Sequence, residues 1–223
     1  MEWFPLWNSL RISFIATIIT FFLGIFFAYY VVKMPGFIKG ILDTILTIPM
    51  VLPPTVVGFI ILKTVSQRSL IGSWVKEYFG TTITMKWYAA IIAVVIVTFP
   101  LMYRTARSSF EAFDKNIIDS AKTLCLSNSY IFWRIILPNS KAGISAGVVL
   151  AFARGLGEYG ATSMVAGYIA NKTATISTTV AYFWQTNQDE KAMDWVLINL
   201  LISCAVMLGV NMFEKKIACG KES

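Results

Sequence analysis

The chain has 223 residues, of which 57% are hydrophobic and only 14% charged, and its formal net charge at pH 7 is +7. Soluble domains have about 45–50% apolar and about 25% charged residues, so the composition excludes an ordinary soluble protein and indicates several membrane spans of about 20 residues each. No basic cluster is interleaved with aromatic residues in a polar segment. The positive charge therefore indicates the cytoplasmic loops of a membrane protein and not nucleic-acid binding.

Five apolar runs are long enough to cross a lipid bilayer, which predicts an all-α, multi-pass protein with one domain over residues 1–223. The runs are residues 10–32, 41–62, 88–103, 142–166 and 195–213. Ser9 is expected to cap the first helix, and the prolines between positions 49 and 54 are expected to kink the second. Residues 174–184 are apolar but too few to span, which predicts a short interfacial or re-entrant helix.

The basic residues predict how these spans are oriented, because cytoplasmic loops are enriched in Lys and Arg. Between the third and fourth runs lie Arg104, Arg107, Lys115, Lys122, Arg134 and Lys141. The C-terminal tail carries Lys215, Lys216 and Lys221. Both segments are therefore expected in the cytoplasm, and five spans then leave the N-terminus outside. Residues 1–8 lack the basic start of a signal peptide, so the first run is expected to be retained.

One loop does not follow the rule that basic residues are enriched in cytoplasmic loops. Residues 63–86 are expected outside the cell, yet they carry four basic residues against the single acid Glu77: Lys63, Arg68, Lys76 and Lys86. The sequence offers no explanation for this excess.

The polar loop of about residues 108–141 is too long and too regular for a simple connector. An amphipathic helix is predicted by four residues at helical spacing, Ile118, Ala121, Leu124 and Cys125. A second short helix, with Ser127 as its N-cap, would present an apolar and basic surface made of Tyr130, Ile131, Trp133 and Arg134. Two such helices fit either a surface for a partner protein or a pair that rests on lipid.

Within this loop the sequence resembles the EAA loop of binding-protein-dependent ABC importers. Asp119, Ser120 and Ala121 occupy the Glu-Ala-Ala positions, Cys125 stands where glycine is usual, and Ile135, Leu137 and Pro138 close the motif. The resemblance implies that the loop docks into a groove of a separate ATPase subunit, through Asp119, Ser120, Ala121, Cys125, Tyr130, Trp133, Leu137 and Pro138. At Cys125 either the turn needs no positive φ, or a cysteine adopts one at some cost.

Two further stretches resemble the molybdate, tungstate and sulfate branch of these importers. They are residues 46–58, Leu-Thr-Ile-Pro-Met-Val-Leu-Pro-Pro-Thr-Val-Val-Gly, and residues 157–162, Gly-Glu-Tyr-Gly-Ala-Thr. The resemblance implies a type I importer permease that moves a tetrahedral oxyanion, molybdate or tungstate, by alternating access. It also implies a second copy of the chain, two cytoplasmic ATPase subunits and an external binding protein. The alternatives are the same machinery for sulfate or another solute, and a non-transporting membrane scaffold.

The sequence itself carries no nucleotide or metal signature. It contains no GxxxxGK[ST] motif, so ATP and Mg²⁺ are expected on the partner ATPase, with no enzymatic activity and no cofactor on this chain. Residues 155–160 match GxGxxG only formally, because no strand precedes them. The three cysteines form no CxxC pair and histidine is absent, so no metal site is expected.

The fourth run holds small residues at every fourth position: Gly143, Gly147, Ala151 and Gly155. This spacing predicts close helix packing within or between subunits, with a role in lining a pathway as the alternative. Arg154 and Glu158 lie four residues apart on the same run, which predicts either a structural ion pair or a role in gating.

A proline break in a membrane helix frees backbone N–H groups, which are tolerated where they are buried in protein or line a cavity. Such groups, with the nearby hydroxyls, would suit the transient binding of an oxyanion, although a kink that only shapes packing is the alternative. The residues expected along a pathway or gate are Thr47, Pro53, Pro54, Thr55, Arg154, Gly157, Glu158, Gly160, Thr162 and Ser163.

Overall fold

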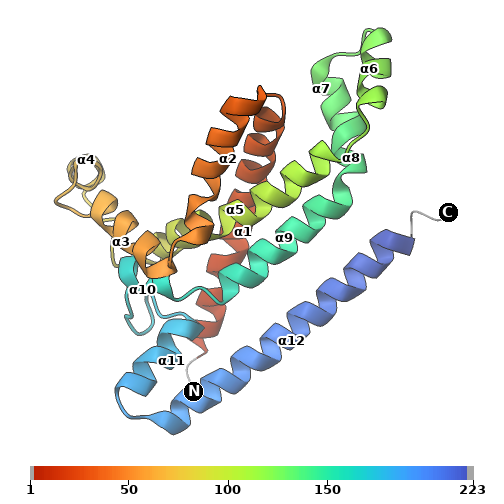
Figure 1. Cartoon of the computed structure of the whole chain (residues 1–223). Coiled ribbons are helices and arrows are strands. Elements are labelled where there is room, and N and C mark those ends of the chain that lie inside the picture. Colours follow the sequence, from red (N-terminus) through yellow and green to blue (C-terminus); the bar gives the residue numbers. More distant parts are fainter. Residues whose placement is uncertain (1–2, 220–223) are drawn as a thin grey trace.

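The computed structural model describes the backbone of residues 3–219 and the side chains of residues 3–114 and 116–209, and residues 3–219 contain helices and no β-strand (Figure 1). The all-α prediction is thereby confirmed. The helices are α1 (Phe4–Val32), α2 (Gly36–Val51), α3 (Pro54–Val65), α4 (Leu70–Phe79), α5 (Trp87–Glu111), α6 (Lys115–Thr123), α7 (Asn128–Ile131), a π-helical turn (Phe132–Ile136), α8 (Leu137–Asn139), α9 (Lys141–Leu156), α10 (Gly160–Val165), α11 (Ile176–Gln185) and α12 (Asp189–Cys219). The side chains of the predicted cytoplasmic tail, Lys215, Lys216 and Lys221, lie outside the described residues.

Three long helices form the centre of the molecule, because α1 packs against α5 and both pack against α9. Two apolar clusters follow one another along α1 and α5. One contains Ile12 and Val94 together with α3 and α10, and the other contains Ala28 and Met102 together with α9. The two ends of the molecule are therefore joined through the same pair of helices.

α1 begins before the first predicted run, so Ser9 is not its N-cap. The helix begins at Phe4, and Pro5 lies in its first turn, where a proline costs no hydrogen bond. Ser9 is buried inside α1, and its Oγ accepts the backbone N–H of Ile176 at 2.9 Å. Asn8 donates to the carbonyl of Ala174 at 2.9 Å. Ser9 and Asn8 thus hold the start of α11 against α1, although their partners lie 167 and 166 residues further along the chain.

The second predicted span is interrupted at its prolines, as expected, and the interruption is a complete break. It is broken at Leu52 and Pro53 into α2 and α3, whose axes differ by 107°. Pro54 is the first residue of α3, and the Pro53 carbonyl accepts the N–H groups of Val56 and Val57. The consecutive prolines therefore end one helix and begin the next in a new direction.

The fourth predicted span, residues 142–166, is also interrupted. α9 ends at Leu156, residues 157–159 are not helical, and α10 begins at Gly160. The small residues of α9 face α5 within the same chain: Gly143 lies against Ser109, Gly147 against Thr105 and Gly155 against Val94. Among the predicted alternatives, close packing inside the subunit is confirmed.

Three helices, Phe4–Val32, Trp87–Glu111 and Asp189–Gly209, are each long and apolar enough to cross a membrane. Within the part of the chain that the structure describes, two bent pairs raise the number to five if each is counted as one span, which equals the predicted number. α11 has ten residues and is too short to cross, also as predicted. The predicted loop of residues 63–86 contains an unpredicted helix, α4.

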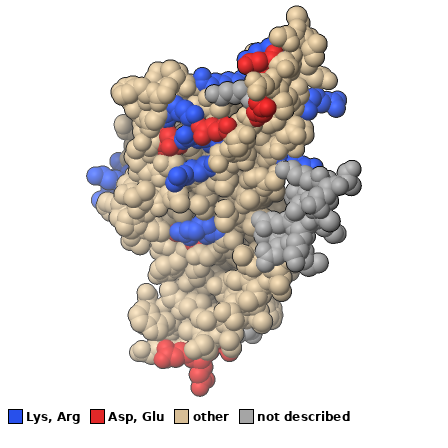
Figure 2. Space-filling view, turned by 45° about the vertical axis from the view of Figure 1, so that its right-hand side comes forward, with Lys and Arg blue, Asp and Glu red and all other residues tan. Residues whose placement is uncertain are grey.

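The molecule has two distinct ends (Figure 1). The turn between α1 and α2 lies at the same end as α6–α8, and the N-terminus and α11 lie at the other. On the face shown in Figure 2, Lys and Arg side chains lie over the upper and middle parts, with Asp and Glu among them, and the lower tip shows Asp and Glu. The first turn of α12, at that tip, contains Asp189 and Glu190.

Candidate functional site

The predicted amphipathic helix of the central loop is α6, and it ends in a tight left-handed turn at Cys125. Cys125 has a φ of 56°, its N–H bonds to the Lys122 carbonyl at 2.9 Å, and the Leu126 N–H bonds to the Ala121 carbonyl at 3.3 Å. These two bonds form a Schellman motif, which places a left-handed residue just after the helix. The turn does require a positive φ, and Cys125 adopts it where the family has glycine.

The apolar face of α6 contains fewer residues than the sequence predicts. Ala121 is buried and Ile118 is half-buried, but Leu124 and Cys125 lie beyond the end of α6 and are exposed. Asp119 is exposed and pairs with Lys122 at 3.2 Å, and Ser120 is exposed as well. α6 therefore offers a polar outer face to a partner.

The second predicted helix is confirmed, and Ser127 is its N-cap, since its Oγ accepts the Tyr130 N–H at 3.3 Å. The chain continues as a π-helical turn into α8, and then bends by 71° into α9. Among the exposed residues of this segment are Tyr130, Trp133, Arg134 and Pro138. Ile131 does not belong to this surface, because it is buried with its neighbour Phe132.

Phe132 anchors the segment to the membrane-spanning helices. Its ring centroid lies 4.4 Å from that of Tyr29 on α1 and 6.1 Å from that of Phe110 on α5. Leu137 packs beside it, against the cluster that contains Met102 and Tyr103. A movement of the exposed surface would thus be passed directly to α1 and α5.

An ionic network, which the sequence analysis did not predict, joins α2 to the same end of α5. Arg107 pairs with Asp43 of α2, and its Nε donates to Glu111 at 3.0 Å. Glu111 also pairs with Lys39 of α2. Because Glu111 is the last residue of α5 and α6 begins at Lys115, this network links α2 to the start of the central loop.

Two breaks that are far apart in sequence contact each other: the proline break at residues 52–53, between α2 and α3, and the glycine break at residues 157–159, between α9 and α10. A Cβ on Gly160 would lie 2.9 Å from Pro54 Cβ and 3.1 Å from the Thr55 nitrogen, and a Cβ on Gly58 would lie 2.7 Å from the Ala161 Cα. α3 and α10 therefore pack backbone to backbone. Gly157 has open space around it, with nothing within 4 Å of the position of a Cβ.

Glu158 holds both ends of the glycine break. The residue is 3% exposed; its Oε2 lies 2.6 Å from Arg154 Nη1 on α9, and its Oε1 accepts the Ala161 N–H of α10 at 2.8 Å. An ion pair between the two residues was predicted, but the bond to Ala161 was not, because the sequence does not reveal that α9 ends at Leu156. One buried carboxylate thus fixes the angle between α9 and α10.

The four predicted hydroxyl donors differ in their surroundings. Thr47 donates to the Asp43 carbonyl at 2.7 Å and Ser163 to the Gly160 carbonyl at 3.0 Å, within their own helices. Thr55 is exposed beside Pro53 and Pro54. Thr162 is buried, and its Oγ1 has no hydrogen-bond partner among the described residues.

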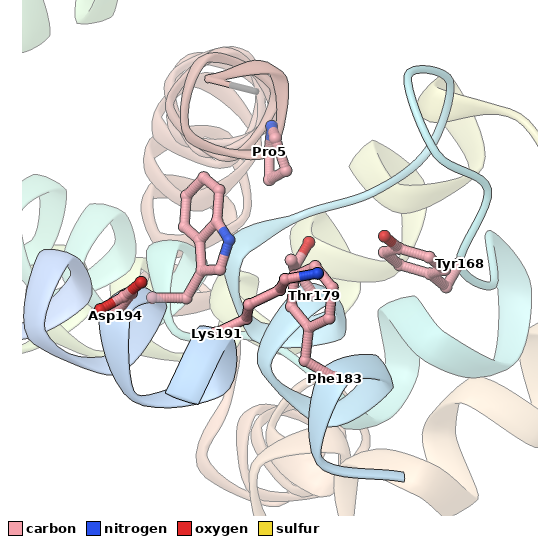
Figure 3. A pocket seen from close by; sticks show the side chains of 7 residues that line it. Pro5, Tyr168, Thr179, Phe183, Lys191 and Asp194 are labelled. Atoms are coloured by element: carbon pink, nitrogen blue, oxygen red, sulfur yellow. The ribbon is translucent and has the colours of Figure 1, made fainter. Parts of the chain in front are cut away.

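A cavity of about 550 Å³ lies at the end away from α6–α8, between α1, the segment before α11, α11 and α12. In Figure 3, Lys191 and Tyr168 reach toward the same space, and Asp194 points away from Tyr168. Its lining comes from four separate segments of the chain, so no local pattern in the sequence could have revealed it.

The comparisons with known proteins agree with this geometry. Residues 20–218 match the family described as binding-protein-dependent transport system inner membrane component. The molybdenum transport system permease protein ModB of Escherichia coli (strain K12) is 37% identical over 212 residues, which cover 91% of this chain and 92% of that protein. The sulfate transport system permease protein CysT of the same strain is 26% identical over 93% of this chain and 75% of that protein.

Two solved structures share the fold. A chain of the MetNI methionine ABC transporter, in an inward-facing conformation, has a TM-score of 0.74 at 13% identity and covers 96% of this chain and 94% of that one. A chain of a bacterial ABC transporter that imports the polysaccharide alginate has a TM-score of 0.78 at 15% identity, covering 96% of this chain and 79% of that one. At these identities the likeness concerns the fold alone.

Proposed function

The chain belongs to the family of binding-protein-dependent transport system inner membrane components, and on that premise we propose that it is the permease subunit of an ATP-driven importer of molybdate or tungstate. Its fold is that of the type I ABC importer permeases. The observation that carries the choice of cargo is the 37% identity to a molybdenum permease over 91% of the chain.

The exposed surface of α6–α8 docks on a cytoplasmic ATPase subunit, which binds ATP and Mg²⁺, while this chain binds neither. Asp119, Ser120, Tyr130 and Trp133 supply the contact surface, because they are exposed on a segment anchored from behind by Phe132. A partner protein is favoured over a resting place on lipid, since Asp119 and Ser120 lie on the outer face and would be unfavourable in contact with acyl chains.

The moving parts are the two broken spans. When ATP draws the two ATPase subunits together, α6–α8 move with them. The contacts with α1 and α5 pass this movement to α9, and the ionic network of Arg107, Asp43, Glu111 and Lys39 passes it to α2. The contact between Pro54 and Gly160 keeps α3 against α10. The carboxylate of Glu158 keeps the end of α9 close to the start of α10. The oxyanion passes close to these breaks, where the exposed hydroxyl of Thr55 offers a weak, neutral contact; Thr162, buried here and without a hydrogen-bond partner among the described residues, becomes a second one when the breaks move apart.

Two copies of the chain assemble around the pathway. α2 has no buried residue in the single chain, and the polar residues Thr44 of α2 and Thr55 of α3 are exposed. Polar groups are unfavourable toward lipid, so a second copy and a water-filled pathway account for this surface better than lipid does. The apolar face of α12, with Leu197, Leu200, Leu201, Met207 and Leu208 exposed, is available to lipid or to the second copy.

The orientation follows from charge. Lys and Arg lie over the upper and middle parts of the face in Figure 2 and the lower tip is acidic, which supports an orientation with the α6–α8 end and the C-terminus in the cytoplasm and the N-terminus outside. An external binding protein delivers the anion to the opposite end, where α1 begins and the cavity beside Lys191 opens.

Sulfate is the second cargo to consider, because a sulfate permease matches 93% of this chain at 26% identity. The test is a competition experiment with the complete complex in vesicles, in which uptake of labelled molybdate is measured against unlabelled tungstate and sulfate. Competition by tungstate at far lower concentrations than sulfate is expected. Uptake of labelled sulfate with no uptake of molybdate would assign the chain to the sulfate branch.

A further inference from the structure

Helix α4 is exposed around most of its surface, and its apolar residues lie together along one half of it. Leu70 is 91% exposed and Tyr78 69% exposed, and Trp74 lies between them at the same helical spacing. Ile71 and Phe79 extend this face and are also more than half exposed. The polar residues Ser73, Lys76 and Glu77 lie on the other half of the helix.

This orientation is fixed by contacts on the opposite side of the helix. Gly72 is buried directly against the carbonyl groups of Val65 and Ser66, where no side chain would fit. Ser69 caps α4 through the Gly72 N–H at 3.0 Å and donates to the Thr64 carbonyl at 2.6 Å. Gly80 ends the helix with a φ of 61°. The apolar face is therefore held outward by both ends and by the glycine contact.

The charges around α4 are unbalanced. Lys63, Arg68, Lys76 and Lys86 are all exposed, Glu77 is the one acidic residue between positions 63 and 86, and no described carboxylate forms an ion pair with any of the four. A half-apolar helix with Trp and Tyr on its apolar face and basic residues around it is the signature of a segment that lies in the headgroup region of a bilayer. The surface is thus complementary to lipid that is both apolar and negatively charged.

We propose that α4 lies flat in the outer headgroup layer and binds anionic phospholipid, with its apolar face in the acyl region and the four basic residues on the phosphates. The neighbouring helix α3 also exposes apolar residues, Val56, Phe59 and Ile60, and α4 lies at the side of the molecule away from α6–α8 (Figure 1). This placement explains why a loop expected outside carries basic residues: they bind lipid and do not set the topology.

The depth of α4 can be measured with a fluorescent probe on a single cysteine in the complete complex, after Cys125, Cys204 and Cys219 are changed to serine. The probe is placed on the apolar face by Trp74→Cys and on the polar face, as a matched control, by Ser73→Cys. Brominated acyl chains are expected to quench the probe at position 74, and aqueous iodide the probe at 73. A probe at 74 that iodide quenches, or that neither quencher reaches because a protein covers it, would overturn the proposal.

The charge preference is measured with the probe at position 74 and either brominated phosphatidylglycerol or brominated phosphatidylethanolamine. Each basic residue near an anionic surface is expected to contribute about a fivefold preference for the anionic lipid. Changing Lys63, Arg68, Lys76 and Lys86 to glutamine should abolish the preference, and Glu77→Gln should increase it. Equal quenching by both lipids in the unaltered complex would contradict the anionic preference. The assay involves no transport, so its result is independent of the proposed cargo.

Discussion

Arg107 of α5 is paired with Asp43 of α2, and the same guanidinium donates through Nε to Glu111 at 3.0 Å. One side chain therefore joins the first half of a broken span to the residue that precedes the cytoplasmic loop. In the proposed mechanism the ion pairs of Arg107 pass the movement of α6 to α2.

Arg107→Gln is expected to reduce the amount of anion imported per ATP hydrolysed. Partly exposed ion pairs each contribute up to about 1 kcal/mol, so the loss of two corresponds to a decrease of up to about thirtyfold. The measurement is uptake and ATP hydrolysis in the same vesicles. Arg104→Gln is the matched control, because Arg104 is exposed and forms none of these pairs. An equal loss in both variants would remove the special role of Arg107.

Cys125→Gly is expected to stabilise the permease. A left-handed conformation costs a residue with a Cβ about 1–2 kcal/mol, and the greater freedom of glycine in the unfolded chain returns part of this gain. Cys125→Val should destabilise it, because a β-branched residue fits this conformation poorly. Thermal unfolding of the purified complex measures both. Cys204→Gly, inside α12, should instead lower stability; stabilisation by glycine at both positions would show that the φ of Cys125 is not the cause.

Gly160→Ala is expected to lower uptake, whereas Gly157→Ala, three residues away, should be tolerated. A methyl group at 160 meets Pro54 at 2.9 Å and forces α10 away from α3, but a methyl group at 157 has nothing within 4 Å. Overpacking of a close contact costs about 1–3 kcal/mol. Both variants are compared in the uptake assay at matched expression, and equal activity of the two would contradict the backbone contact between the breaks.

Glu158→Gln is expected to lower uptake more than expression. Glutamine can still accept the Ala161 N–H but cannot balance the charge of Arg154, so the fold is kept and the ion pair is lost. Glu158→Ala removes both contacts and should reduce expression as well, because an unpaired buried group costs about 1–3 kcal/mol. Membrane content by immunoblot and uptake are measured together. Normal uptake by Glu158→Gln would leave the ion pair with no part in transport.

Trp133→Ala is expected to weaken binding of the ATPase subunit by about thirtyfold, because an exposed tryptophan at the centre of a docking surface commonly contributes about 2 kcal/mol. Trp184→Ala is the matched control, since Trp184 is exposed to a similar extent but lies on α11, at the other end of the molecule. Binding of the purified ATPase is measured directly. If the two alanine variants bind it equally well, the docking surface does not include Trp133.

The sequence predicted those features that depend on local pattern. The apolar runs, the short length of α11 and the cap at Ser127 were all identified, because hydropathy and capping act over a few residues. Ser9 was misassigned, since its partner Ile176 is 167 residues away. The end of α9 at Leu156 was hidden because the residues that follow are mostly small or apolar. The pairing of Arg107 with Asp43 needed the arrangement of α2 against α5, which no spacing rule supplies.

α4 is a different case, because its pattern was present in the sequence. Leu70, Trp74 and Tyr78 recur at every fourth position, and Ser69 and Gly80 stand at the two ends. What the sequence could not show was the direction of the apolar face, which depends on the contact of Gly72 with Ser66.

Uptake into sealed vesicles shows whether this chain forms the membrane passage of an ATP-driven oxyanion importer. The permease is reconstituted with its ATPase and the external binding protein, and labelled molybdate is counted inside the vesicles with and without ATP. Molybdate is expected to accumulate only when ATP and all three proteins are present, and accumulation should stop when the ATPase cannot hydrolyse ATP. ATP-independent entry of molybdate, or hydrolysis with no uptake of molybdate, tungstate or sulfate, would contradict it.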